Sequence, residues 1–69
     1  MNALQQMVIL QKATVSARTR MLDKTIATQV KAGQVQITRV TYNNKGKSTV
    51  LPVSGWMSVT DAVEFLDRM

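Results

Sequence analysis

Residues 34–53 read QVQITRVTYNNKGKSTVLPV, and this stretch decides the fold class. Residues 34–42 alternate polar and apolar side chains and are rich in β-branched types, which predicts a strand. Residues 43–47 are polar and contain Gly46, which predicts a turn, and residues 48–53 form the returning strand. Because Pro52 has no backbone N–H, we expect this second strand to lie at a sheet edge or to end there.

The apolar positions of the first strand change phase along its length. Val35 and Ile37 would point to one face of a regular strand, whereas Val40 and Tyr42 would point to the other. A bulge between the two pairs would return all four side chains to one face. The sequence therefore predicts a bulge in the middle of this strand.

The chain before this hairpin predicts one long amphipathic helix over residues 3–31, with Asn2 as N-cap and Gly33 as C-terminal cap. At about 100° per residue, its apolar side chains gather on one side. They are Leu4, Val8, Val15, Leu22, Ile26 and Val30. The polar, β-branched stretch 14–19 leaves open whether this helix is continuous.

Residues 59–68 predict a short second helix. Ser58 followed by Asp61 is typical of a capped helix N-terminus. The apolar residues recur at the spacing of one buried helix face. They are Val59, Ala62, Val63 and Leu66.

The predicted fold class is therefore α+β, in one domain over residues 1–69. It comprises a long N-terminal helix, a two-stranded antiparallel hairpin and a short C-terminal helix. A chain this short buries a small core and often needs a further source of stability. Since it has no Cys and no His, disulfides and the usual zinc sites are excluded, and we expect a homodimer or larger homo-oligomer.

The charges of the chain are segregated. Eight of the nine cations precede position 48, whereas three of the four acids follow position 60. A net charge of +5 favours polyanionic partners such as nucleic acid or an acidic protein surface. A solvated basic face explains the same charge equally well.

The residue inventory argues against an enzyme. There is no His, no nucleophile motif, no glycine-rich phosphate loop and no cofactor motif in the sequence. Asp61, Glu64 and Asp67 are explained by capping and solvation of the second helix. We therefore expect a binding protein that has no cofactor, no metal and no small-molecule substrate.

The first functional hypothesis is a dimeric regulatory protein that presents a basic surface to nucleic acid. Its phosphate contacts would come from cations on the first helix and the hairpin. These are Arg18, Arg20, Lys24, Lys31, Arg39, Lys45 and Lys47. The residue pattern does not distinguish DNA from RNA.

The second hypothesis is a protein-binding adaptor or inhibitor of phage or mobile-element type, acting through the hairpin edge and the region of Trp56. Trp56 either closes the core or forms a binding hot spot, since Trp is enriched in such spots. Across both hypotheses, the predicted protein-interface residues are Leu4, Val8, Val15, Leu22, Ile26, Trp56 and Met57.

A family resemblance supports keeping the second hypothesis. The helix–hairpin–helix order, followed by Ser58-Val59-Thr60-Asp61-Ala62-Val63-Glu64-Phe65-Leu66, resembles the small head–tail joining protein of lambda-like phages over about half of the chain. This chain departs from that family in its longer first helix and in lacking a basic tail. The resemblance implies a role in virion assembly.

The longest apolar run, residues 7–10, is too short for a membrane span, which needs about 20 residues. A first helix that is basic opposite its apolar stripe could bind a membrane surface, and this is the least favoured of the alternatives. The expected location is the cytoplasm of a bacterium or of a virus-infected cell.

Overall fold

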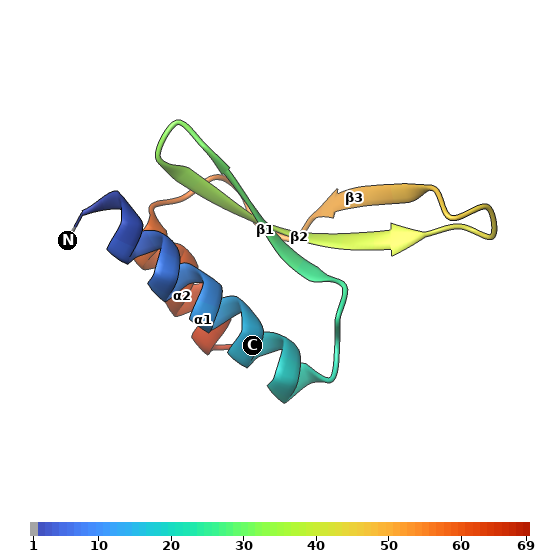
Figure 1. Ribbon diagram of the computed structural model, residues 1–69, viewed down its shortest axis with the longest axis horizontal. Coiled ribbons are helices and arrows are strands. Elements are labelled where there is room, and N and C mark those ends of the chain that lie inside the picture. Colours follow the sequence, from blue (N-terminus) through green and yellow to red (C-terminus); the bar gives the residue numbers. More distant parts are fainter. Residues whose placement is uncertain (1) are drawn as a thin grey trace.

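Two helices and three strands follow one another in the order α1, β1, β2, β3, α2 in the computed structural model, which describes residues 2–69 (Figure 1). Their bounds are α1 Ala3–Met21, β1 Ile26–Lys31, β2 Gln34–Tyr42, β3 Ser48–Pro52 and α2 Val59–Asp67. The α+β class is confirmed. The two-stranded hairpin is corrected to a three-stranded antiparallel sheet of order β1-β2-β3.

The long first helix predicted over residues 3–31 is wrong over residues 22–31. Helix α1 begins at the predicted cap, where the Asn2 side chain accepts a hydrogen bond from the Gln5 N–H at 2.8 Å. It ends at Met21, and Leu22 takes a left-handed conformation with φ +52°. The chain then turns back into β1, which pairs with β2 from Ile26 opposite Arg39 onward.

Gly33 belongs to a β-turn and does not cap a helix. Lys31 is paired with Gln34, so Ala32 and Gly33 form a two-residue loop. Both have positive φ, +52° and +76°, which is the backbone of the tight turn that suits twisted antiparallel strands.

The two helices run in the same direction and cover one face of the sheet only over its first half (Figure 1). The core lies between these layers, and it is built from side chains of all the elements except β3. Its buried apolar members are Leu10, Ala13 and Ala17 of α1, Ile26, Val35 and Ile37 of the strands, and Ala62 and Leu66 of α2.

The second helix matches its prediction. Helix α2 begins after Ser58, whose hydroxyl accepts a hydrogen bond from the Asp61 N–H at 3.1 Å. Ala62 and Leu66 are fully buried, and Val59 and Val63 are half-buried beside them. Within residues 2–69, no helix is long and apolar enough to span a membrane.

Candidate interaction surfaces

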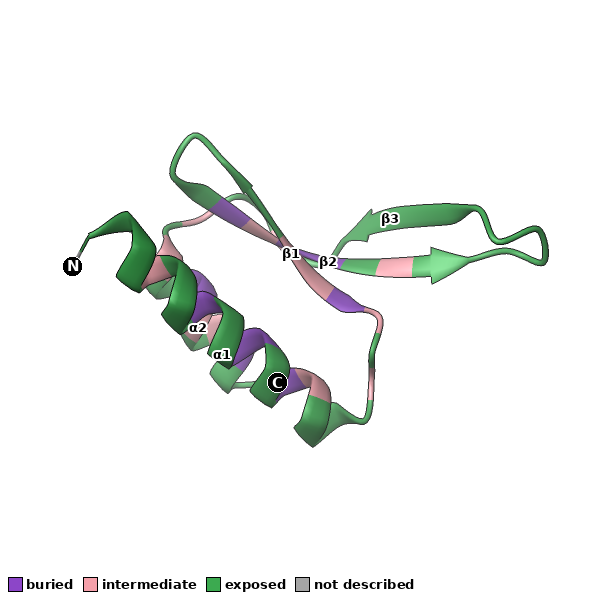
Figure 2. Ribbon diagram, viewed as in Figure 1, coloured by how far each residue is buried: buried purple, intermediate pink, exposed green. Residues whose placement is uncertain are grey.

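The second half of β2 and all of β3 form an arm that extends beyond the helices (Figure 1). We call residues 40–52 the arm. Every residue of β3 is exposed, and β3 contacts neither helix. Figure 2 shows the contrast, because the buried residues of β2 stop where the arm begins. The arm is therefore a ribbon with water on both faces.

The phase change within β2 occurs without a bulge. β2 pairs with β1 residue by residue from Gln34 to Arg39, and with β3 residue by residue from Thr38 to Tyr42. The bulge predicted from the sequence is therefore wrong. Val35 and Ile37 are buried under the helices, so in a regular strand the even-numbered residues of β2, including the buried Thr38, lie on the opposite face.

One face of the arm is consequently apolar and unpartnered. Val40 is paired with Val50 across the ribbon, so their side chains share that face, and Tyr42 follows on it two residues later. Tyr42 is 70% exposed and Val50 is 43% exposed. The phase change was the sequence signal for this face, but it had been interpreted as a bulge.

The tip of the arm is a well-formed turn. The Asn43 side-chain oxygen accepts hydrogen bonds from the backbone N–H groups of Lys45, at 2.9 Å, and Lys47, at 3.0 Å. Gly46 has φ +78°, which a side chain would disfavour, as the sequence predicted. The backbones that carry both lysines are thus held in a defined conformation, and both residues are exposed.

The outward side of α1 carries a second apolar set. Leu4, Val8 and Val15 are 73%, 42% and 58% exposed and lie opposite the face that α1 buries in the core. The other three predicted members of that stripe, Leu22, Ile26 and Val30, do not join them, and Val30 lies in β1. Leu22 follows the helix end and is 91% exposed, whereas Ile26 lies in β1 and is fully buried, so its assignment to an interface is wrong.

Trp56 and Met57 follow the arm and lie beside the first turn of the sheet. Met57 pairs with Val35 through two backbone hydrogen bonds of 2.7 and 2.9 Å and packs against the core, so it is a structural residue. Trp56 is 42% exposed and lies beside Lys31 and Ala32 of the β1–β2 turn. Its exposed surface remains accessible to a partner.

Three of the predicted phosphate-binding cations are engaged inside the molecule. The Arg18 Nε donates a hydrogen bond to the Ile26 carbonyl oxygen and so joins α1 to β1. Arg20 donates to the carbonyl oxygens of Leu66, at 2.6 Å, and Met69, at 3.3 Å, at the end of α2. These two arginines connect structural elements.

Arg39 is the third engaged cation. Its guanidinium forms an ion pair of 3.0 Å with Asp23, the one ion pair found within residues 2–69. Hydrogen bonds from the Thr25 hydroxyl and N–H lower the pKa of the Asp23 carboxyl below its ordinary value of 3.8, and the charge of Arg39 lowers it further. Arg39 therefore helps to hold the α1–β1 connection against β2.

The remaining predicted cations do not form one patch. Lys24 lies in the α1–β1 connection, Lys31 lies at the β1–β2 turn, and Lys45 and Lys47 lie at the tip of the arm. These three places are well separated in the molecule, which measures 42 × 27 × 19 Å (Figure 1). The fold thus disperses charges that are close together in the sequence.

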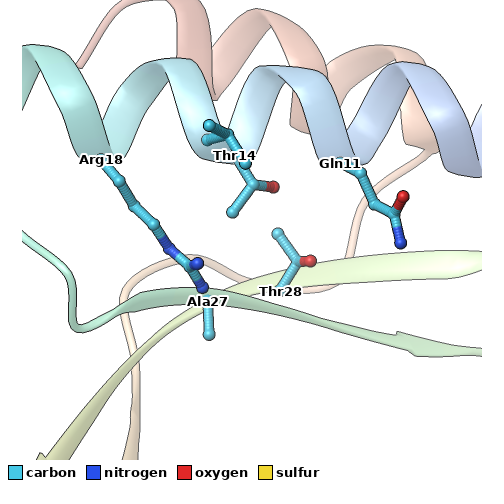
Figure 3. Close-up of a pocket in the computed structure, with 6 residues that line it drawn as sticks. Gln11, Thr14, Arg18, Ala27 and Thr28 are labelled. Atoms are coloured by element: carbon cyan, nitrogen blue, oxygen red, sulfur yellow. The ribbon is translucent and has the colours of Figure 1, made fainter.

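An open cleft of about 390 Å³ separates α1 from β1 (Figure 3). Gln11, Thr14 and Arg18 extend from the helix toward Ala27 and Thr28 of the strand, and Val15 completes the lining. The Thr14 hydroxyl donates to the Leu10 carbonyl oxygen at 2.8 Å, and Arg18 is already engaged with Ile26. Two of the polar side chains that line the cleft, Thr14 and Arg18, therefore make their hydrogen bonds within the fold.

Comparison with known proteins finds no relative of this chain. No protein-family model matches the chain, and no curated protein or solved structure matches it significantly. The resemblance to the phage joining protein is therefore not supported by these comparisons.

Proposed function

We propose that this chain is a small non-enzymatic protein-binding adaptor whose principal contact surface is the arm. The observation that carries this proposal is the phase change in β2. Val35 and Ile37 are buried under the helices, whereas Tyr42 and its neighbours on the other face have no partner within the fold. The first half of β2 is apolar on the face that packs against the helices, and its second half is apolar on the opposite face. This arrangement suits one contact inside the chain and a second contact with another protein.

The backbone of the arm supports the same function. β3 is an edge strand, so its outward N–H and C=O groups are available to another chain. Addition of a strand at such an edge is a common mode of peptide and protein recognition. The apolar face then gives the contact its selectivity.

The distribution of cations favours this proposal over nucleic-acid binding. A phosphate-binding surface needs several cations along one path, because each contacted phosphate adds to the affinity. Here Arg18, Arg20 and Arg39 are engaged in the fold. The exposed lysines Lys24, Lys31, Lys45 and Lys47 lie in three separate places.

The experiment compares two variants of the arm that alter opposite faces. Tyr42→Ser combined with Val50→Ser removes two exposed apolar side chains from the apolar face, and Thr41→Ser combined with Thr49→Ser is the matched control on the other face. The tagged proteins are used to isolate complexes from nuclease-treated lysate of the cells that make the chain. We expect a complex of defined stoichiometry with the wild type and the control, and its loss with the first variant.

A titration against a labelled DNA duplex at two salt concentrations tests the competing function. Micromolar binding that collapses with salt, together with a complex that survives Tyr42→Ser/Val50→Ser, would overturn the proposal. Circular dichroism of each variant shows whether it remains folded.

A further inference from the structure

A groove lies between the N-terminal halves of the two helices, on a part of the molecule that the arm does not reach. Its volume is about 210 Å³. The lining is mainly apolar, with one carboxylate: Gln6, Ile9, Val59, Thr60, Val63 and Glu64. It is a recess for an apolar side chain that has an acid at its edge.

The helix that borders this groove carries the acidic charge of the molecule. Asp61, Glu64 and Asp67 recur every three residues along α2, and all three are exposed. None of them forms an ion pair within residues 2–69. Glu64, in the lining of the recess, and Asp67, three residues later on α2, are therefore carboxylates without an ion pair.

The tip of the arm has the complementary composition. Lys45 and Lys47 are exposed cations without an ion pair in the described part of the chain, and Tyr42, three residues before Lys45, is a 70% exposed aromatic residue. Their backbone is held by Asn43. Because β3 contacts neither helix and the arm extends away from them, the tip cannot meet the acidic groove of its own chain (Figure 1).

We propose that the arm tip of one copy binds the acidic groove of a second copy, and that the two copies exchange arms reciprocally. Tyr42 enters the groove, and Lys45 and Lys47 pair with Glu64 and Asp67. This inference rests on the proposed function, since it names a second copy of the chain as a partner of the arm.

Symmetry and charge both support a second copy as the occupant. The arm and the groove lie toward opposite ends of a molecule 42 Å long, so two copies placed side by side in opposite directions bring each arm to the other copy's groove. A two-fold pair of this kind is the commonest form of oligomer. Opposite charges also define the register of such a contact.

A charge exchange between two variants tests the contact. The first variant carries Lys45→Glu and Lys47→Glu, and the second carries Glu64→Lys and Asp67→Lys. Each variant alone places like charges at both contacts, whereas a mixed pair restores opposite charges at both. Light scattering coupled to size exclusion, at low salt and over a range of concentrations, should give twice the chain mass for the wild type and the mixture, and the chain mass for each variant alone.

The control variant carries Lys12→Glu and Lys31→Glu, which produce the same change of net charge away from the arm tip. It should retain the wild-type mass. The inference would be overturned if either charge-reversed variant of the contact stayed associated on its own, if their mixture did not associate, or if the wild-type chain were monomeric throughout. Raising the salt concentration should shift the wild type toward the chain mass, because the exposed ion pairs are screened.

Failure of this inference can be distinguished from failure of the proposed function. If the wild type is monomeric but Tyr42→Ser/Val50→Ser still abolishes the complex recovered from lysate, the arm binds another protein and the self-association is wrong. If that variant retains the complex, the proposed function is wrong as well.

Discussion

The two halves of β2 lie in opposite environments. Its first half is covered by two helices and buries Val35 and Ile37 completely, whereas its second half pairs with β3 in an arm that no helix covers. Both halves have the residue types of a strand, and both are paired without interruption. Hydrogen-bonded pairing therefore extends farther than the core does.

This difference separates two uses of an apolar side chain. In the covered half, apolar residues stabilise the fold because folding removes their side chains from water, between the sheet and the helices. In the arm, residues such as Tyr42 and Val50 remain exposed and contribute little to the stability of the monomer. They gain their full contribution only when a partner covers them.

Truncation of a buried side chain should show the contrast most strongly. Leu66 is fully buried, so Leu66→Ala should lower the free energy of unfolding by about 2–5 kcal/mol. Leu51 is 50% exposed in the arm, and Leu51→Ala should cost less than about 1 kcal/mol. Urea unfolding of both variants measures the difference. Equal losses would mean that the arm is part of the core.

Substitution of Arg20 should lower the stability of the part of the molecule that contains the helices. Arg20→Gln removes the hydrogen bonds that hold the carbonyl groups at the end of α2, at an expected cost of about 1 kcal/mol. Lys24→Gln removes the same charge from a residue with no described side-chain hydrogen bond and should be nearly neutral. Unfolding by urea, followed by circular dichroism, compares the two. A similar loss in both would assign the effect to net charge.

Substitution of Leu22, where α1 ends, should relieve backbone strain and slightly stabilise the half of the molecule that the helices cover. Leu22 has φ +52° and is 91% exposed, so Leu22→Gly removes an unfavourable left-handed conformation and loses little packing. After the entropic cost of glycine, we expect a net gain of about 0.5 kcal/mol. Lys24→Gly, at a position without positive φ, should instead reduce stability. The melting temperatures of the two variants should move in opposite directions.

The smallest expected effect is at the junction of the two halves. Arg39 lies where β1 and β3 both pair with β2, and its ion pair with Asp23 anchors the α1–β1 connection there. Since the pKa of Asp23 is lowered by folding, its stabilisation is complete above pH 3.8 and is lost as the pH falls through the lower folded value. Asp23→Asn should therefore reduce stability slightly at neutral pH. The difference from wild type should vanish in strong acid, as measured by urea unfolding at a series of pH values.

The local features of the fold could be predicted from the sequence. The bounds of β2, the turn with Gly46, the edge position of β3 and the caps at Asn2 and Ser58 all agree with the structure. The turn and the caps depend on interactions between residues a few positions apart, whereas the edge position of β3 was predicted from Pro52, which has no backbone N–H. Such interactions are determined before any tertiary contact forms.

The strand β1 was missed because its apolar residues fit two periods at once. Leu22, Ile26 and Val30 are spaced by four, which places them on one side of a helix and also on one face of a strand. Within the hairpin, β2 provides the hydrogen-bond partners that make residues 26–31 a strand. The pair Ala32–Gly33 was the local signal for that turn.

For the predicted binding residues, too, some properties follow from the sequence and others follow only from the fold. The segregation of basic and acidic residues and the phase change in β2 are properties of the sequence alone. Only the tertiary structure decided that Ile26 is buried, that Arg18, Arg20 and Arg39 are engaged in the fold, and that the arm is exposed. The physical reason is that the availability of a side chain depends on which neighbour covers it, and that neighbour is often distant in the chain.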